Sequence, residues 1–76
     1  MSPSDLKKRL ENAFLGAQIE VTDLTGTQDH YQVSVVSPVF SGKSRIQQQR
    51  LVMDVFQAEL RSGEVHALTI RTATPA

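Results

Sequence analysis

The longest run of helical spacing lies between Phe40 and Leu60. Its apolar residues fall mostly on one broad stripe: Ile46, Val52, Met53, Val55, Phe56 and Leu60. Ser44 is followed three residues later by Gln47, which is the spacing of a capping box, and Gly63 stands where a left-handed residue would end a helix. The pattern predicts one long helix after a turn at 40–43, although its β-branched residues leave a break into two helices open.

A shorter helix is predicted at the N-terminus. Ser2 suits the N-cap, Pro3 suits the first helical position, and Asp5 lies in the first turn, where the helix dipole favours a carboxylate. Apolar residues then recur at helical spacing up to Gly16: Leu6, Leu10, Ala13 and Phe14.

Strand-type patterns occupy the remainder. Residues 17–24 alternate between apolar and polar, residues 25–29 are polar with one glycine, and a return strand begins at His30 or Tyr31 and ends before Pro38. A third strand is predicted over 65–72. The first two strands form a hairpin, so they run antiparallel, whereas the helical crossover makes the third strand parallel to the second.

These elements predict a single α+β domain over residues 1–76. Their order is helix, strand, strand, helix with or without a break, strand. A mixed three-stranded sheet with the helices packed on one face follows from this order.

Composition narrows the functional classes. The chain has 76 residues, no cysteine, and eight basic against eight acidic residues. Neutral charge disfavours a dedicated DNA-binding domain, and lack of cysteine excludes a disulfide, a thiolate metal site and a thiol nucleophile. We find neither an apolar run of membrane-spanning length nor a signal-peptide pattern, so we expect a cytoplasmic protein without membrane contact.

The two histidines are the most informative polar residues. His30 opens the second predicted strand and His66 opens the third, so parallel pairing would put both at one edge of the sheet. Two imidazoles make a partial metal site that leaves positions open for outside ligands. The alternation of side chains along a strand argues against a simple pairing. His66 would lie on the same face of the sheet as the apolar Leu68, whereas His30 would lie on the face opposite to the inward-pointing Tyr31. Two unrelated surface histidines therefore remain the alternative.

Catalysis receives little support, and we expect no enzyme. No serine stands in a nucleophile-elbow pattern, and the carboxylates fall singly. The element order also occurs in nucleic-acid-binding KH domains, but their GXXG clamp is incomplete because Arg45 follows Gly42 at the second glycine position. Lys43, Arg45 and Arg50 are the candidates for contact with phosphates.

The chain resembles the BolA-like proteins over nearly its whole length. The matching segments are FSGKSR at 40–45, RLV at 50–52, and VHALTI at 65–70 followed by Thr72 and Thr74-Pro75. The DHYQV segment at 29–33 and the three glutamines at 47–49 are similar to the shorter bacterial subgroup that carries a histidine in this loop. The chain departs from many members in the long helix, where it has Gln48-Gln49-Arg50 in place of a common R-H-R run.

This resemblance implies a KH-like (type II) fold and a non-enzymatic partner of monothiol glutaredoxins in iron–sulfur cluster handling or iron sensing. The [2Fe-2S] cluster would be shared with glutaredoxin and glutathione and not bound by this chain alone. His66 and His30 would be its metal ligands, and Gly42, Lys43 and Arg45 would lie near the partner or glutathione. The apo form is expected to be a monomer or a weak dimer.

Two other functions remain open. The first is a KH-like, DNA-binding transcriptional regulator that uses Lys43, Arg45 and Arg50. The second is an interaction module with no cofactor, because resemblance alone does not establish an activity.

Overall fold

The structure is a computed structural model that describes residues 2–26 and 30–75. Its elements in chain order are α1 (Pro3–Ala13), β1 (Gln18–Asp23), β2 (His30–Val36), the 3-10 helix η1 (Pro38–Phe40), α2 (Arg45–Val55), α3 (Gln57–Ser62) and β3 (Ala67–Ala73). The α+β class and the predicted element order are confirmed.

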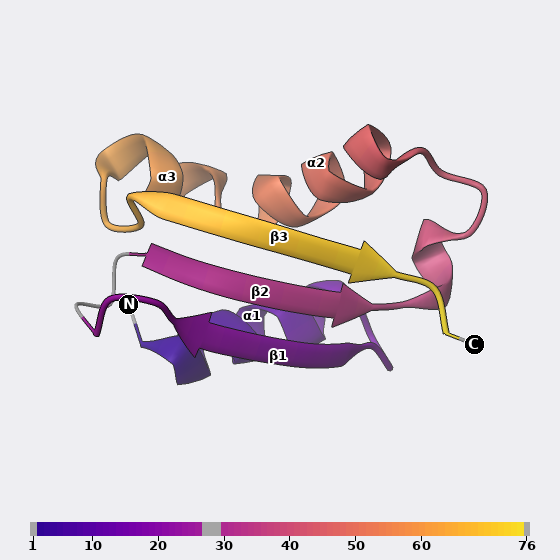
Figure 1. Ribbon diagram of the computed structural model, residues 1–76, viewed down its shortest axis with the longest axis horizontal. Helices are drawn as coiled ribbons and strands as arrows, with labels where there is room; N and C mark the ends of the chain where they lie inside the picture. Colours follow the sequence, from indigo (N-terminus) through magenta and orange to yellow (C-terminus); the bar gives the residue numbers. More distant parts are fainter. Residues whose placement is uncertain (1, 27–29, 76) are drawn as a thin grey trace.

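The three strands form one sheet in the order β1-β2-β3 (Figure 1). β1 pairs with β2 antiparallel, with Val21 opposite Val33, and β2 pairs with β3 parallel, with Val33 opposite Ile70. The mixed sheet and the parallel crossover predicted from the hairpin and the long helix are therefore confirmed.

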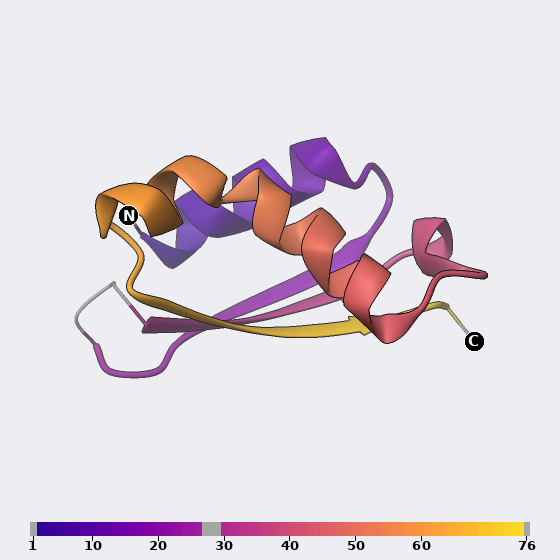
Figure 2. The same cartoon turned by 90° about the horizontal axis from the view of Figure 1, so that it is seen from above.

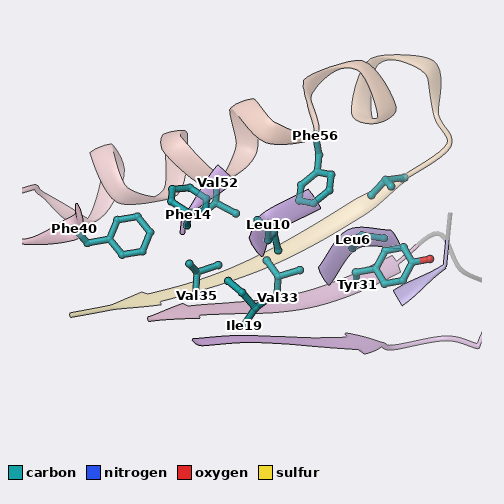
Figure 3. Packing of buried hydrophobic residues seen from close by; sticks show 11 residues of the cluster. Leu6, Leu10, Phe14, Ile19, Tyr31, Val33, Val35, Phe40, Val52 and Phe56 are labelled. Carbon is teal, nitrogen blue, oxygen red and sulfur yellow. The ribbon is translucent and has the colours of Figure 1, made fainter. Parts of the chain in front are cut away.

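All the helices lie on one face of the sheet, and no helix of the described residues covers the other face (Figure 2). The buried core lies between these layers, and its side chains come from both (Figure 3): Leu6, Leu10, Phe14, Ile19, Tyr31, Val33, Val35, Phe40, Val52, Phe56 and Val65. The alternation seen along β2 in the sequence is the alternation of buried and half-buried side chains in the structure.

Both predicted helix starts are capped as expected. The Ser44 hydroxyl accepts from the backbone N–H of Gln47, whose side chain accepts in return from the backbone N–H of Ser44. Ser2 and Asp5 form the same reciprocal pair at the start of α1. Each box satisfies two backbone donors that a helix terminus would otherwise leave without partners.

The long helix is broken at Phe56. The backbone of Phe56 has φ −111° and ψ 20°, outside the helical region, and its ring is fully buried (Figure 3). The predicted apolar stripe is wrong at two positions within α2: Ile46 and Met53 are 65% and 44% exposed.

The third strand begins later than predicted. β3 starts at Ala67, not at Val65, so His66 precedes the strand instead of opening it. Val65 is nevertheless fully buried, and its backbone N–H donates to the Glu59 carbonyl. Of the predicted hairpin loop at 25–29, positions 27–29 lie outside the described residues.

None of the helices in the described part of the chain combines the length and apolar character needed to cross a bilayer.

Candidate functional site

The structure brings His30 and His66 together. Their imidazole ring centroids are 6.0 Å apart and their ring planes differ by 14°. His30 is half-buried at the first position of β2, and His66 is exposed immediately before β3. The two histidines are far apart in the sequence. They nevertheless form one pair at the edge of the sheet where the parallel strands β2 and β3 begin.

Strand register explains why the two histidines meet. His30 pairs in register with Ala67, so His66 lies one residue outside the ladder. The argument from alternation against the pair was misleading, because His66 is not in a strand and its side chain need not follow strand alternation. The same-edge argument from parallel topology was correct.

The turn before His66 is defined by Gly63. Gly63 has φ +84° and ends α3 in the left-handed conformation, as its position in the sequence predicted. A Cβ at this position would lie 4.0 Å from Cε1 of His66. The glycine therefore packs close to the imidazole without crowding it.

The ring separation of the pair, although not the stacked ring orientation, is close to that of two imidazole ligands of one metal ion. Metal–nitrogen bonds of about 2.1 Å at a tetrahedral angle put two imidazole centroids roughly 5 Å apart. The observed 6.0 Å is within about 1 Å of this value, but the two rings are stacked, so both would reach one ion only after at least one ring turned.

The described residues offer no complete metal site. Within 2–26 and 30–75, no group of three or more histidine, cysteine, aspartate or glutamate side chains is arranged to hold a metal ion. Two imidazoles leave at least two positions of a tetrahedral ion open. A metal held here with full coordination thus takes its other ligands from outside the described part of the chain.

The predicted basic and glycine residues lie at the other end of the sheet. The carbonyl of Lys43 accepts from the Gln48 side chain, which in turn accepts from the hydroxyl of Thr72 near the end of β3. His66 and Thr72 are six positions apart along the approach to β3 and the strand itself, or about 20 Å at the strand rise. Figure 1 shows α2 starting beside the arrowhead of β3. The structure therefore does not bring Gly42, Lys43 and Arg45 to the histidines.

A groove lies between α2 and β3 at this far end. It has a volume of about 410 Å³ and is lined by Arg45, Gln49, Ile70, Arg71 and Thr72. No carboxylate lines it, and neither guanidinium forms a hydrogen bond or ion pair with the described residues. Arg45 was a predicted phosphate contact. Arg71 was missed, because nothing in the sequence indicated that β3 would run beside the start of α2.

The other two predicted basic residues line a separate depression. Lys43 and Arg50 share it with Asp54 and Leu51, and its volume is about 240 Å³. The carboxylate of Asp54 makes this depression less favourable for an anion than the groove at Arg45. The three predicted phosphate contacts are thus divided between two places.

Comparison with known proteins identifies relatives along the chain. The sequence model of the family described as BolA-like protein matches residues 8–76. An uncharacterized protein of Rickettsia prowazekii is 35% identical over 72 residues, which cover 95% of this chain and 92% of that protein. The SufE-like protein 1 of Arabidopsis thaliana is 45% identical over 49 residues, covering 64% of this chain but only 13% of that much longer protein.

A solved structure shares the fold. The BolA domain of SufE1 from Arabidopsis thaliana superposes with a TM-score of 0.85 at 33% identity, covering 96% of this chain and 91% of the other. The agreement extends over the sheet and all three helices, so the architecture described above is that of a known domain type.

Proposed function

The chain belongs to the BolA-like family, and from this premise we propose that it is a non-enzymatic partner of a monothiol glutaredoxin that shares a [2Fe-2S] cluster through His66 and His30. The proposal rests chiefly on one observation, the two imidazole rings 6.0 Å apart at the start of β2 and β3. A role in iron–sulfur cluster handling or iron sensing follows from such ligation.

The ligand chemistry supports a shared cluster over a cluster held by this chain alone. The sequence contains no cysteine, so this chain can provide imidazoles but no thiolates. Thiolates are the usual ligands of iron–sulfur clusters, and a cysteine of glutaredoxin together with the thiolate of glutathione would provide them. The similarity to a protein named SufE-like protein 1 agrees with an iron–sulfur role.

In this proposal the residues of this chain would bind one iron of the cluster and orient the cluster. Neutral imidazole nitrogens of His66 and His30 would coordinate one iron, and replacing thiolates by imidazoles raises the reduction potential of such a cluster. His66 is exposed and His30 is half-buried, so part of the pair is accessible to a partner. When bound, the cluster supplies the redox and iron chemistry, and the chain supplies two of its ligands.

Anaerobic co-reconstitution with a monothiol glutaredoxin and glutathione tests this proposal. Wild type should give a visible circular dichroism spectrum distinct from that of the glutaredoxin homodimer, and His66→Ala should abolish or alter it. His30→Ala tests the second ligand, and Gln57→Ala, an exposed position on α3, is the control. An unchanged spectrum for His66→Ala would exclude His66 as a ligand, and no heterodimer spectrum with wild type would reject the proposal.

The groove at Arg45 and Arg71 favours one alternative, a regulator that binds DNA. Two guanidinium groups without a neighbouring carboxylate form a site that attracts phosphates. In this alternative Arg45→Ala and Arg71→Ala each weaken binding and reduce its salt dependence, whereas Arg61→Ala on α3 does not. Absence of binding at low salt would remove this alternative.

A further inference from the structure

The side chain of Arg9, on α1, contacts the break between α2 and α3. Arg9 donates from Nη1 to the Val55 carbonyl at 3.5 Å and forms an ion pair with the Glu59 side chain. Its guanidinium carbon also lies 5.7 Å from the centroid of the Phe56 ring. Arg9 therefore joins the end of α2, the residue at the break and the first turn of α3.

This ion pair is partly shielded from water. The side chain of Glu59 is 13% exposed and that of Arg9 is 41% exposed. A carboxylate with so little exposure interacts with its cation more strongly than in a surface pair, where solvent screens the charges. The pair thus restricts the position of α3 relative to α1.

Glu59 is connected in turn to the segment that leads to His66. Its main-chain carbonyl accepts from the backbone N–H of Val65 at 3.1 Å, and Val65 is fully buried. Between these two residues Gly63 reverses the chain, and a Cβ on Gly63 would lie 4.0 Å from Cε1 of His66. One residue, Glu59, is therefore bonded to α1 through its side chain and to the approach of β3 through its backbone.

We propose that Arg9 and Glu59 are a positioning pair that fixes the α3–β3 turn and so places His66 opposite His30. The proposal rests on the proposed function, because it assigns a purpose to the placement of a ligand. Neither residue touches the imidazoles. They act through Val65 and Gly63, which connect α3 to His66.

The test compares Arg9→Gln and Glu59→Gln with two matched controls. Arg61→Gln removes an exposed cation from α3, and Glu11→Gln removes an exposed carboxylate from α1; neither has an ion pair with the described residues. Amide hydrogen exchange of Val65 and the NMR signals of the His66 ring are measured in the free protein. Arg9→Lys, which keeps the charge but offers fewer donors, should fall between wild type and Arg9→Gln.

We expect the Val65 amide to exchange about fivefold faster in Arg9→Gln and Glu59→Gln, since a partly exposed ion pair contributes about 1 kcal/mol. The His66 ring signals should shift in both variants and return toward wild type in Arg9→Lys. Unchanged Val65 exchange and ring signals would overturn the proposal. An equal acceleration at Val65 and at the core amides of Leu10 and Val33 would also overturn it, because the pair would then stabilise the fold as a whole.

The same variants are then tested for the cluster. If wild type forms the heterodimer, Arg9→Gln and Glu59→Gln should reduce its circular dichroism signal, and both controls should retain it. If wild type forms no heterodimer, the proposed function fails, while exchange at Val65 and the ring signals still decide whether Arg9 and Glu59 position His66.

Discussion

The first turn of α1 is closed by Ser2 and Asp5. The Asp5 carboxylate accepts from the backbone N–H of Ser2 at 3.2 Å, and the Ser2 hydroxyl accepts from the backbone N–H of Asp5 at 3.1 Å. The hydrogen bond from the Ser2 backbone, followed by that from its side chain, lowers the pKa of Asp5 below its usual 3.8. Its charged form is therefore favoured in the folded protein.

A lowered pKa makes this cap sensitive to acid. The stabilising contribution of Asp5 is present above the unfolded-state pKa and is lost as the pH falls through the lower pKa of the folded state. Asp5→Asn should thus destabilise the protein near neutral pH and lose that difference well below pH 3.8. Urea unfolding near neutral pH and well below pH 3.8 measures the difference in unfolding free energy between Asp5→Asn and wild type, and Glu11→Gln is the control. A difference that did not change with pH would contradict the prediction.

Gly63 provides a second prediction at single-residue scale. Its φ of +84° lies in the left-handed region, and an added Cβ would make only an ordinary contact with His66. Gly63→Ala should therefore cost about 1–2 kcal/mol through backbone strain alone. Gly63→Asn should cost less, because asparagine tolerates this conformation better. Chemical denaturation measures both, and equal stability of Gly63→Ala and wild type would show that the turn rearranges.

At this scale the sequence predicted residues that act locally and missed those that act at a distance. The caps Ser2 and Ser44 and the helix end at Gly63 depend on neighbours within three residues, so their patterns are readable. The ion pair of Arg9 with Glu59 spans 50 residues. No local pattern marks such a contact, because it depends on how α1 packs against α3.

At the scale of elements, the Gln48 side chain connects α2 both to the segment that precedes it and to β3. Its Nε2 donates to the carbonyls of Phe40 and Lys43 at 3.3 and 2.9 Å, and its Oε1 accepts from the hydroxyl of Thr72 at 2.6 Å. The first two bonds fix the loop before α2, and the third fixes α2 to β3. One amide thus joins three segments.

Gln48→Ala should destabilise the protein by about 1–2 kcal/mol, because the partly buried Phe40 carbonyl loses its donor and the partly buried Thr72 hydroxyl loses its acceptor. Gln57→Ala removes an exposed glutamine that makes no contact of this kind with the described residues, so it should change stability little. Urea denaturation of both variants gives the comparison. Equal free energies of unfolding for the two variants would mean that water replaces the three hydrogen bonds without cost.

The helix break illustrates what periodicity can and cannot predict. Val52 and Phe56 are four residues apart and both are buried, as expected for two residues on the same face of one helix. The stripe fails at Ile46 and Met53, which the single-helix pattern also assigned to the core. A pattern of spacing predicts which side of a helix is apolar, whereas the break depends on the Phe56 ring fitting the core beneath it.

At the scale of the whole molecule, the two candidate sites lie at opposite ends of an elongated fold. The molecule measures 34 Å along its longest axis and about 20 Å across, and α3 and the start of α2 lie toward opposite ends of that axis (Figure 1). The histidine pair lies at the first end, and the groove of Arg45 lies at the second. A molecule that contacted both candidate sites would therefore have to extend along much of the long axis.

Because the two sites are far apart, substitutions near one site should affect the free energy of unfolding independently of substitutions near the other. Glu59→Gln acts near the histidine end and Gln48→Ala acts near the groove, and the two residues share no hydrogen-bond partner within the described part of the chain. Their effects on the free energy of unfolding should therefore add within about 0.5 kcal/mol in the double variant. Chemical denaturation of the two single variants and the double variant tests this. A larger coupling would mean that α2 and α3 move as one body despite the break.

The overall topology was the part of the fold that the sequence predicted best. The hairpin and the crossover leave few arrangements of three strands, and the handedness rule for crossovers reduces them further. The candidate histidine pair followed from that topology before any side chain was placed. The groove did not, because its lining comes from residues such as Arg45 and Arg71 whose proximity depends on how α2 lies along β3.

The parallel pairing of β2 with β3 also sets the order in which the histidine pair can form. His30 belongs to a hairpin whose strands are close in sequence, whereas His66 reaches it only after 35 intervening residues have been folded back across the sheet. Contacts of such sequence separation are slow to form because loop closure costs entropy before the contact contributes. A chain with the hairpin formed and β3 still unpaired carries one imidazole at this edge. The two-histidine arrangement therefore exists only in molecules whose crossover has closed, and binding of a ligand that needs both nitrogens selects fully folded protein.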